Sequence, residues 1–256
     1  MEFQLYSDIH LEFTPDSFPR ISKKASNLIL AGDIGHISMQ NFKDFIKYCS
    51  ESFEHVFYVC GNHEFYGSRS METLILKFKA FMGEFQNVYF LDNSYILIEG
   101  ILIYGFTCWT RSIFKDPGSA LMSGLADYHK IRTKEGKYDI VYQNKLADNQ
   151  IELFKEFINS INNNEILCDK IIIVTHFPPI GNKTSNPIYD GNFLNRYFSW
   201  NNIFTEESIT CDKIKVWCSG HTHWSYDFIK NDIRFISNQF GYPDEGCIFE
   251  DKVFSI

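Results

Sequence analysis

The sequence lacks any apolar run that approaches the roughly 20 residues required by a membrane-spanning helix. It also lacks internal repeats, low-complexity segments and blocks of like charge. Its seven cysteines are scattered, odd in number and never arranged as a C-x-x-C pair, which favours free, reduced thiols. No signal peptide is expected, because the first polar motif already begins at Asp8. These absences predict a soluble, globular, cytoplasmic protein.

Positive charge is scarce as well. The chain has 24 Lys and Arg residues against 32 Asp and Glu, a net charge of −8 and an isoelectric point near 5.5. An acidic surface of this kind disfavours binding along an extended nucleic-acid backbone. It is compatible with a small phosphorylated substrate, provided that bound metal ions supply the local positive charge.

Apolar residues are plentiful, at 45% of the chain, with 25 Phe and 14 Tyr. A length of 256 residues predicts one domain over residues 1–256. Strand-like apolar runs alternate with helix-like amphipathic stretches in each half, which predicts an α/β fold of layered sheets. The pattern fails at about 109–139 and 180–200, and we interpret both stretches as loop insertions of functional interest.

Five short polar clusters each follow an apolar, strand-like run. Taken singly, an Asp-x-His or His-x-His pair is a weak signal. Their shared position carries more weight, because strands of an α/β sheet end at a common crevice where such folds bind ligands. The clusters are Asp8 with His10, Asp33, Asn62 with His63, His176, and His221 with His223.

The donors in these clusters are carboxylate, imidazole and amide groups, with no thiolate. Such donors suit Mn, Fe or Zn better than a thiolate site or a calcium site built of oxygen alone. Asp33 could bridge two ions, because a carboxylate has two oxygens. Two four-ligand sites that share Asp33 would use all seven candidates: Asp8, His10, Asp33, Asn62, His176, His221 and His223.

The ordered series SDIH, AGDI, GNHE, VTHF and GHTH resembles the calcineurin-like metallophosphoesterase superfamily. The resemblance implies two stacked mixed β-sheets flanked by helices, a four-layer α-β-β-α sandwich. It implies two divalent metal ions. One would be bound by Asp8, His10, Asp33 and His223, and the other by Asp33, Asn62, His176 and His221.

The resemblance further implies a dinuclear metal-dependent phosphoester hydrolase, in which a metal-bridging hydroxide attacks phosphorus of a small phosphomonoester or phosphodiester. Asp33 and His63 are the expected catalytic residues, with His63 contacting the phosphoryl group and protonating the leaving oxygen. Glu64 stands where many members have Asp, and either carboxylate could accept a hydrogen bond from the His63 ring.

Two alternatives stay open at this point. One is a nuclease or nucleotide phosphodiesterase. The other is a metal-bearing scaffold without turnover, which would bind a protein partner through the two insertions.

Four further residues are candidates for substrate contact. Tyr66 follows the central motif closely, Arg111 and His129 lie in the first insertion, and Arg196 lies in the second. Arginine suits phosphate because its guanidinium donates parallel hydrogen bonds. Ordinary surface charge or loop packing is the alternative interpretation for each of the four.

Overall fold

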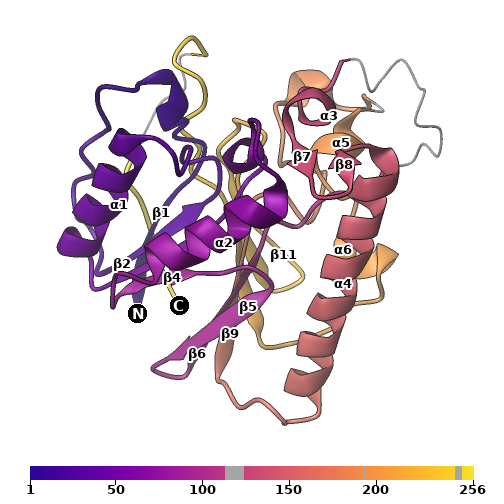
Figure 1. Cartoon of the computed structure of the whole chain (residues 1–256). Coiled ribbons are helices and arrows are strands. Elements are labelled where there is room, and N and C mark those ends of the chain that lie inside the picture. The colour runs from indigo at the N-terminus through magenta and orange to yellow at the C-terminus, as the bar shows by residue number, and fades with distance from the viewer. Residues whose placement is uncertain (113–123, 193, 246–249) are drawn as a thin grey trace.

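The computed structural model describes residues 1–112, 124–192, 194–245 and 250–256. Two large mixed β-sheets form its centre (Figure 1). In the five-stranded sheet the order is β13-β1-β2-β3-β4. Four of its strands run parallel: β1 (Glu2–Tyr6), β2 (Asn27–Ala31), β3 (His55–Val59) and β4 (Val88–Phe90). The edge strand β13 (Lys252–Ser255) pairs antiparallel with β1.

The six-stranded sheet has the order β11-β12-β10-β9-β6-β5. Its four central strands are parallel: β6 (Ile101–Phe106), β9 (Lys170–Thr175), β10 (Ile214–Cys218) and β12 (Ile233–Ile236). The edge strands β5 (Ser94–Ile98) and β11 (Asp227–Lys230) are antiparallel to their neighbours. β5 and β6 form an antiparallel hairpin that turns at Glu99 and Gly100.

The inner faces of the two sheets pack against each other. Side chains alternate between the two faces of a strand. Phe57 and Val59 of β3 therefore face inward and join Ile103 of β6 in one buried cluster between the sheets. Tyr58, between them in sequence, faces outward and packs in the cluster beneath the helices.

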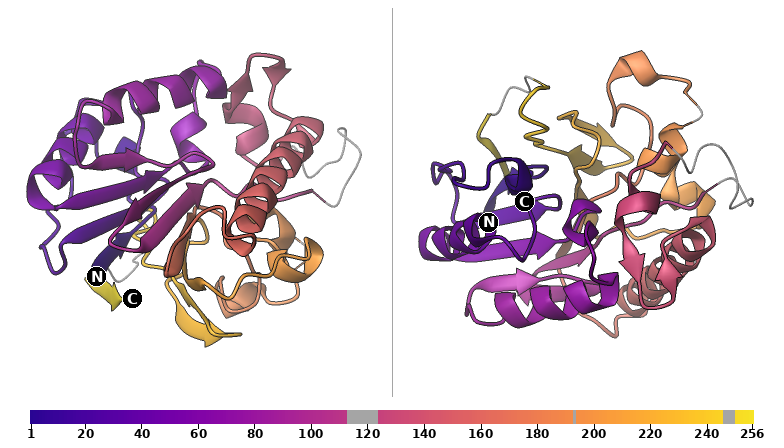
Figure 2. Two further views of the ribbon diagram at one scale, coloured as in Figure 1. Left: turned by 90° about the horizontal axis from the view of Figure 1, so that it is seen from below. Right: turned by 45° about the horizontal axis from the view of Figure 1, so that its top comes forward.

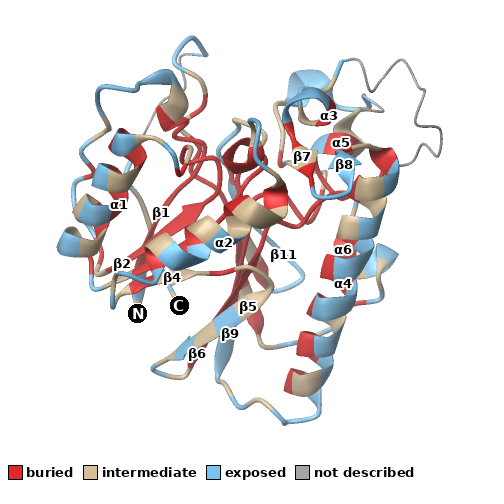
Figure 3. Cartoon of the chain, viewed as in Figure 1, coloured by how far each residue is buried: buried red, intermediate tan, exposed pale blue. Residues whose placement is uncertain are grey.

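Helices cover both outer faces (Figure 2). On the five-stranded sheet, Phe42 of α1 (Gln40–Ser52) and Phe78 of α2 (Met71–Met82) both pack on Tyr58, with ring centroids 6.1 and 5.9 Å away. On the six-stranded sheet, Phe157 of α4 (Ile140–Asn162) stacks on Tyr104 at 4.3 Å. Each helix buries one face and exposes the other, as Figure 3 shows. The predicted α-β-β-α sandwich is confirmed.

The two insertions contain short elements that the sequence pattern did not reveal. The first holds α3 (Asp127–Lys130), β7 (Arg132–Thr133) and β8 (Gly136–Lys137), and its residues 113–123 lie outside the described part. The second holds η3 (Pro187–Tyr189) and α5 (Asn195–Phe198), with residue 193 outside the described part. Elements of two to four residues are too short to leave a hydrophobic period. The single-domain interpretation of residues 1–256 stays a prediction.

Three other short elements complete the structure. They are η1 (Leu11–Phe13), η2 (His63–Phe65) and α6 (Ile203–Glu206). Among the helices of the described ranges, none is both long and apolar enough to cross a membrane.

Candidate metal centre and active site

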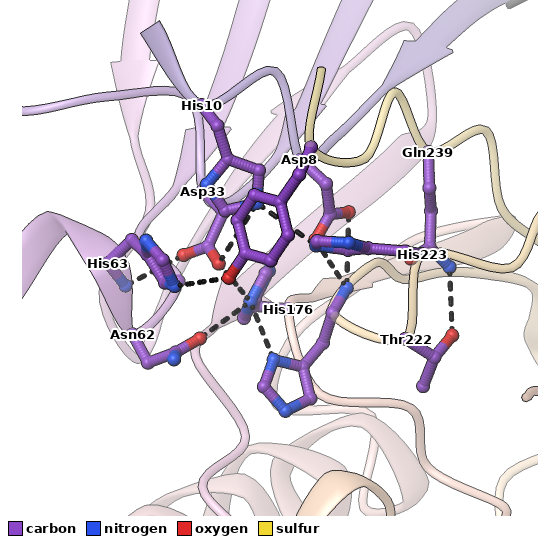
Figure 4. Close-up of polar contacts among 12 residues, drawn as sticks. Asp8, His10, Asp33, Asn62, His63, His176, Thr222, His223 and Gln239 are labelled. Carbon is purple, nitrogen blue, oxygen red and sulfur yellow. Dashed lines mark hydrogen bonds and ion pairs between the residues drawn. The ribbon is translucent and has the colours of Figure 1, made fainter. Parts of the chain in front are cut away.

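The seven candidate metal ligands follow strands of both sheets and lie close to one another. Figure 4 labels six of them: Asp8, His10, Asp33, Asn62, His176 and His223. They follow the parallel strands β1, β2, β3, β9 and β10. The carboxyl ends of these strands meet because the two sheets are stacked, so residues up to 215 positions apart become neighbours. This is the location that the sequence pattern predicts.

Five of the seven have a left-handed backbone: φ is 55° at Asp8, 52° at His10, 53° at Asp33, 76° at His221 and 50° at His223. This conformation is uncommon for residues other than glycine. Strain of this kind persists where the surrounding structure enforces it, and it concentrates at functional sites. All five lie in the loops that follow β1, β2 and β10.

One group of donor atoms comes from Asp8, His10, Asp33 and His223. Nε2 of His10 lies 3.0 Å from Nε2 of His223 and 3.9 Å from Oδ2 of Asp33. Nε2 of His223 lies 3.6 Å from Oδ1 of Asp8. These atoms converge on a common point, which is the arrangement that a metal ion requires of its ligands.

A second group surrounds Nε2 of His176. That atom lies 3.3 Å from Oδ2 of Asp33, 3.0 Å from Oδ1 of Asn62 and 3.2 Å from Nδ1 of His221. Asp33 thus contacts both groups through the same carboxylate oxygen. The structure brings all seven candidates together and sorts them into the two sets that the resemblance implies.

Three imidazoles have a hydrogen-bond acceptor next to Nδ1, the ring nitrogen that faces away from the cluster. Nδ1 of His10 lies 3.1 Å from Oε1 of Glu12, and Nδ1 of His176 lies 3.0 Å from the carbonyl oxygen of Ala31. Nδ1 of His223 lies 2.5 Å from Oε2 of Glu245. A proton on each Nδ1 leaves the Nε2 lone pair directed at the cluster, the usual orientation of a metal-binding histidine. The donor set therefore fits divalent ions.

The amide of Asn62 is oriented in the same way. Its Nδ2 donates to Oδ1 of Asp127 at 2.9 Å and to the hydroxyl of Tyr66 at 3.2 Å. The Tyr66 hydroxyl in turn donates to Asp127 at 2.6 Å. With its NH₂ group engaged, Asn62 presents its carbonyl oxygen to the cluster.

The electrostatics of the cluster also favour a cation. Burial alone would lower the pKa of His176, but the Asp33 carboxylate raises it to about 10. Despite its own burial, Asp33 has a pKa well below its usual range because His176 lies beside it. Burial and the charge of His176 hold the pKa of His221 low. The buried carboxylates thus require positive charge, which divalent ions would supply.

Three glycines allow the backbone to approach these side chains closely. A Cβ on Gly61 would lie 2.2 Å from Oδ1 of Asp33, and a Cβ on Gly220 would lie 2.5 Å from Oδ2 of Asp8. A Cβ on Gly32, whose φ is +86°, would lie 2.5 Å from Nδ1 of His176. No real Cβ is accommodated at these distances, so the site depends on glycine at all three positions.

His63 lies beside the cluster. Its backbone N–H donates to Oδ1 of Asp33 at 2.8 Å, its Nδ1 lies 2.8 Å from Oε1 of Glu12, and its Nε2 lies 3.0 Å from the hydroxyl of Tyr242. Burial opposes protonation of the ring, but the carboxylates of Asp33 and Glu12 raise its pKa.

The expectation that Glu64 accepts a hydrogen bond from the His63 ring is wrong, since Glu12 occupies that position. The Glu64 carboxylate points into the protein and fixes the loop backbone instead. It accepts hydrogen bonds from the N–H groups of Gly61, Asp33 and Ile34 and from the hydroxyl of Tyr58 at 2.7–3.0 Å. Glu64 still supports the site, but through the backbone of Asp33.

A cavity of about 480 Å³ opens over the cluster. Asp33, Asn62, His63, His221 and His223 contribute to its floor, and both insertions contribute to its wall. Aromatic and amide side chains dominate that wall, among them Tyr128, Gln143, Tyr189, Asn192, Asn195, Tyr197 and Phe198. Among the described residues that line it, none is lysine or arginine.

The four candidates for substrate contact divide evenly. Tyr66 lines this cavity, and His129 lines a second cavity that also borders His63. The structure places Arg111 and Arg196 outside the lining of both cavities, so their contact with substrate stays a prediction. Arg111 forms ion pairs with Asp148 at 2.6 Å and Glu207 at 2.5 Å, Arg196 pairs with Glu206 at 2.9 Å, and neither lines a cavity that borders the cluster. Carboxylates on neighbouring helices already occupy both guanidinium groups.

Four residues of the site escaped the sequence interpretation: Glu12, Asp127, Tyr242 and Glu245. Glu12 could have been recognised from the sequence, because Asp8, His10 and Glu12 are polar residues at every second position. Asp127 lies in an insertion without periodicity, and Tyr242 and Glu245 come from a loop near the C-terminus. Nothing in their local sequence distinguishes these three from surface residues.

The protein is an α/β sandwich of two stacked sheets. Its clustered carboxylates and imidazoles form two adjoining sets of potential metal ligands. A family model for the calcineurin-like phosphoesterases matches residues 1–225. The chain belongs to this family.

Known proteins agree with the assignment. An uncharacterised protein, L509, of Acanthamoeba polyphaga mimivirus is 30% identical over 265 residues, covering 93% of this chain and 90% of its own. The phosphopantetheinyl hydrolase of Mycobacterium tuberculosis has a TM-score of 0.65 at 14% identity, covering 94% of this chain and 89% of its own. A dimetal phosphatase from Danio rerio has a TM-score of 0.54 at 11% identity, covering 93% and 87%. At these identities the two structures support the fold.

Proposed function

We propose that the chain is a dinuclear metal-dependent phosphoester hydrolase that acts on a small phosphomonoester or phosphodiester. The observation that carries the proposal is the sharing of one Asp33 oxygen between two sets of convergent donor atoms. Two divalent ions held by these donors would supply a Lewis acid for a phosphoryl oxygen and would lower the pKa of a bound water. Mn, Fe or Zn would suit these nitrogen and oxygen donors.

His63 is the proposed proton donor to the leaving oxygen. Glu12 fixes its Nδ1, so that Nε2 is the nitrogen that faces Tyr242 and the main cavity. The raised pKa of His63 favours the protonated ring, which is the form that a general acid needs. When substrate binds, Nε2 would exchange the Tyr242 hydroxyl for the leaving oxygen.

The main cavity supports a substrate with an uncharged, polar or aromatic group beside its scissile phosphate. Its wall offers tyrosine and phenylalanine rings for stacking and amides for hydrogen bonds. Two structural neighbours are named a phosphopantetheinyl hydrolase and a putative 5′-nucleotidase, and these names support an organic phosphoester. The aromatic wall also favours the second candidate, a nucleotide phosphodiesterase, because a base could stack there.

The experiment is turnover of 4-nitrophenyl phosphate and bis(4-nitrophenyl) phosphate, with elemental analysis of the same sample. We expect two metal ions per chain, loss of turnover in chelator and recovery with Mn. The ratio of monoester to diester turnover separates the two candidates. Bound metal without turnover on a broad phosphoester panel would instead support the protein-binding scaffold.

A further inference from the structure

A second cavity, of about 590 Å³, adjoins the proposed active site. His63 and Tyr66 line both this cavity and the one over the metal-type cluster. Four cationic side chains line the second cavity: Arg69, Lys77, Lys130 and Arg132. The first cavity has none among its described residues, so positive charge is confined to one side of the site.

The four cations are not neutralised within the described ranges, where none of them forms an ion pair with a carboxylate. Lys130 places its Nζ 4.9 Å from the ring centre of Tyr66. Arg132 donates through Nη1 to the carbonyl oxygens of His129 and Ile131 at 2.7 and 3.0 Å. The cavity also contains Glu12, but its Oε1 already faces His10 and His63.

Hydrogen bonds join the two segments that form the walls of this cavity, residues 66–70 and 130–132. Backbone bridges join Tyr66 to Ile131 and Ser70 to Arg132, and the N–H of Gly67 donates to the carbonyl oxygen of Lys130 at 2.9 Å. The first insertion is therefore docked on the segment between η2 and α2. His36 lines the same cavity, and its buried Nε2 has no hydrogen-bond partner in the described structure.

We infer that this cavity binds a second phosphate of the substrate, carried by the leaving group. The inference rests on the proposed function, in which the leaving oxygen lies at His63. Because His63 lines both cavities, a leaving group bound there can extend from the main cavity into the second one. Unpaired lysine and arginine side chains are the groups that proteins use to bind phosphate. The chain as a whole has a net charge of −8, so this cluster is a local concentration of positive charge in an acidic protein. The preferred substrate then resembles a diphosphate or a bisphosphate.

The test uses Arg69→Ala with Lys77→Ala as a double variant, because neither residue belongs to the proposed catalytic machinery. Lys79→Ala is the matched control, since Lys79 is an exposed residue of the same helix, α2, and does not line the cavity. Inorganic phosphate and inorganic pyrophosphate compete with 4-nitrophenyl phosphate turnover in the Mn-loaded enzyme. We expect the double variant to lose about tenfold or more in pyrophosphate inhibition, with phosphate inhibition and basal turnover unchanged.

A second measurement does not depend on turnover. Equilibrium dialysis of labelled pyrophosphate against chelator-treated protein reports binding at the cations alone. We expect binding that weakens with salt and is reduced in the double variant, but not in the control. Absence of turnover with this binding intact would contradict only the proposed function. Pyrophosphate inhibition and binding that are the same in the double variant and the wild type would overturn the inference.

Discussion

Glu12 is the residue on which the proposed proton donor depends, because one of its oxygens faces both His10 and His63. Burial opposes its ionisation, but hydrogen bonds from the two imidazoles lower its pKa to about 2. It is therefore ionised throughout the neutral range. It couples a candidate metal ligand to the candidate general acid through a single charge.

Substitution Glu12→Gln tests this coupling. The amide keeps the size of the side chain but removes the charge that raises the pKa of His63. We expect turnover to fall by about 10- to 100-fold, the range seen when a partner of a metal-binding histidine is lost. The alkaline limb of the pH–rate profile, where the general acid loses its proton, should move to lower pH. Glu54→Gln, at an exposed residue that bonds Ser26, is the control, and equal activity in the two variants would refute the role.

Gly61→Ala tests the close approach of the loop to Asp33. The added Cβ would lie 2.2 Å from Oδ1 of Asp33 and 2.7 Å from Nε2 of His176, so the shared carboxylate must move. We expect about a 10- to 100-fold loss of metal affinity, measured by calorimetric titration with Mn. Gly83→Ala, at a residue with φ of −66° that ends α2, should bind Mn normally. Full metal affinity in Gly61→Ala would contradict the geometry.

The sequence predicts the residues that follow strands far better than those that support them. Asp8, Asn62 and His176 are recognisable because each directly follows an apolar run, and the strand fixes where its end lies. Tyr242 is not recognisable, because it reaches His63 across 179 positions from an irregular loop. Arg111 is the opposite case: its residue type suits phosphate, but in the structure its guanidinium forms ion pairs with Asp148 and Glu207.

Among the elements, α3 has the most direct effect on the site. It is four residues long, yet its Asp127 orients the amide of Asn62 and accepts from Tyr66. The first insertion thus contributes to the metal-type cluster without supplying a ligand.

Asp127→Ala tests this contribution. Without the acceptor, the Asn62 amide is free to rotate and present its NH₂ group to the cluster. We expect turnover and metal affinity to fall by about tenfold, as measured by steady-state kinetics and Mn titration. Glu135 lies in the same insertion and forms an ion pair with exposed Lys145, so Glu135→Ala is the control and should behave as wild type. A similar effect in both variants would indicate general loosening of the insertion.

The long helix α4 begins at a side-chain cap, and its stability can be tested separately from activity. Oδ1 of Asp139 accepts from the N–H of Tyr142 at 2.8 Å. Asp139→Ala should reduce the free energy of unfolding by about 1 kcal/mol, measured by urea denaturation, and leave metal binding unchanged. A change in metal affinity without a change in stability would contradict this separation.

The length of an element decides how well the sequence predicts it. α2 and α4 span 12 and 23 residues, so their apolar stripes repeat over several turns. β7 and β8 have two residues each and form because the insertion folds back on itself. β13 went unrecognised, because its pairing with β1 depends on a partner about 250 positions away.

At the scale of the whole molecule, metal binding and protonation compete for the same site. The pKa of His176 is raised to about 10 by Asp33, so the metal-free ring is protonated at neutral pH. A metal must displace that proton, and its apparent affinity therefore rises with pH. We expect a gain of about tenfold per pH unit for one displaced proton between about pH 6 and pH 8. An affinity for Mn that is constant across this range would disagree with the assignment of His176 as a ligand.

The dispersal of the seven candidate ligands between positions 8 and 223 sets the order of events during synthesis. β10, which delivers His221 and His223, is synthesised after β1, β2, β3 and β9, which deliver the other five candidates. Neither set of donors is complete before β10 has been synthesised, so a fully ligated metal centre cannot precede the rest of the fold. The sandwich must form largely on the strength of its apolar layers. The packed core then stabilises the left-handed backbone conformations of the loops that carry the candidate ligands.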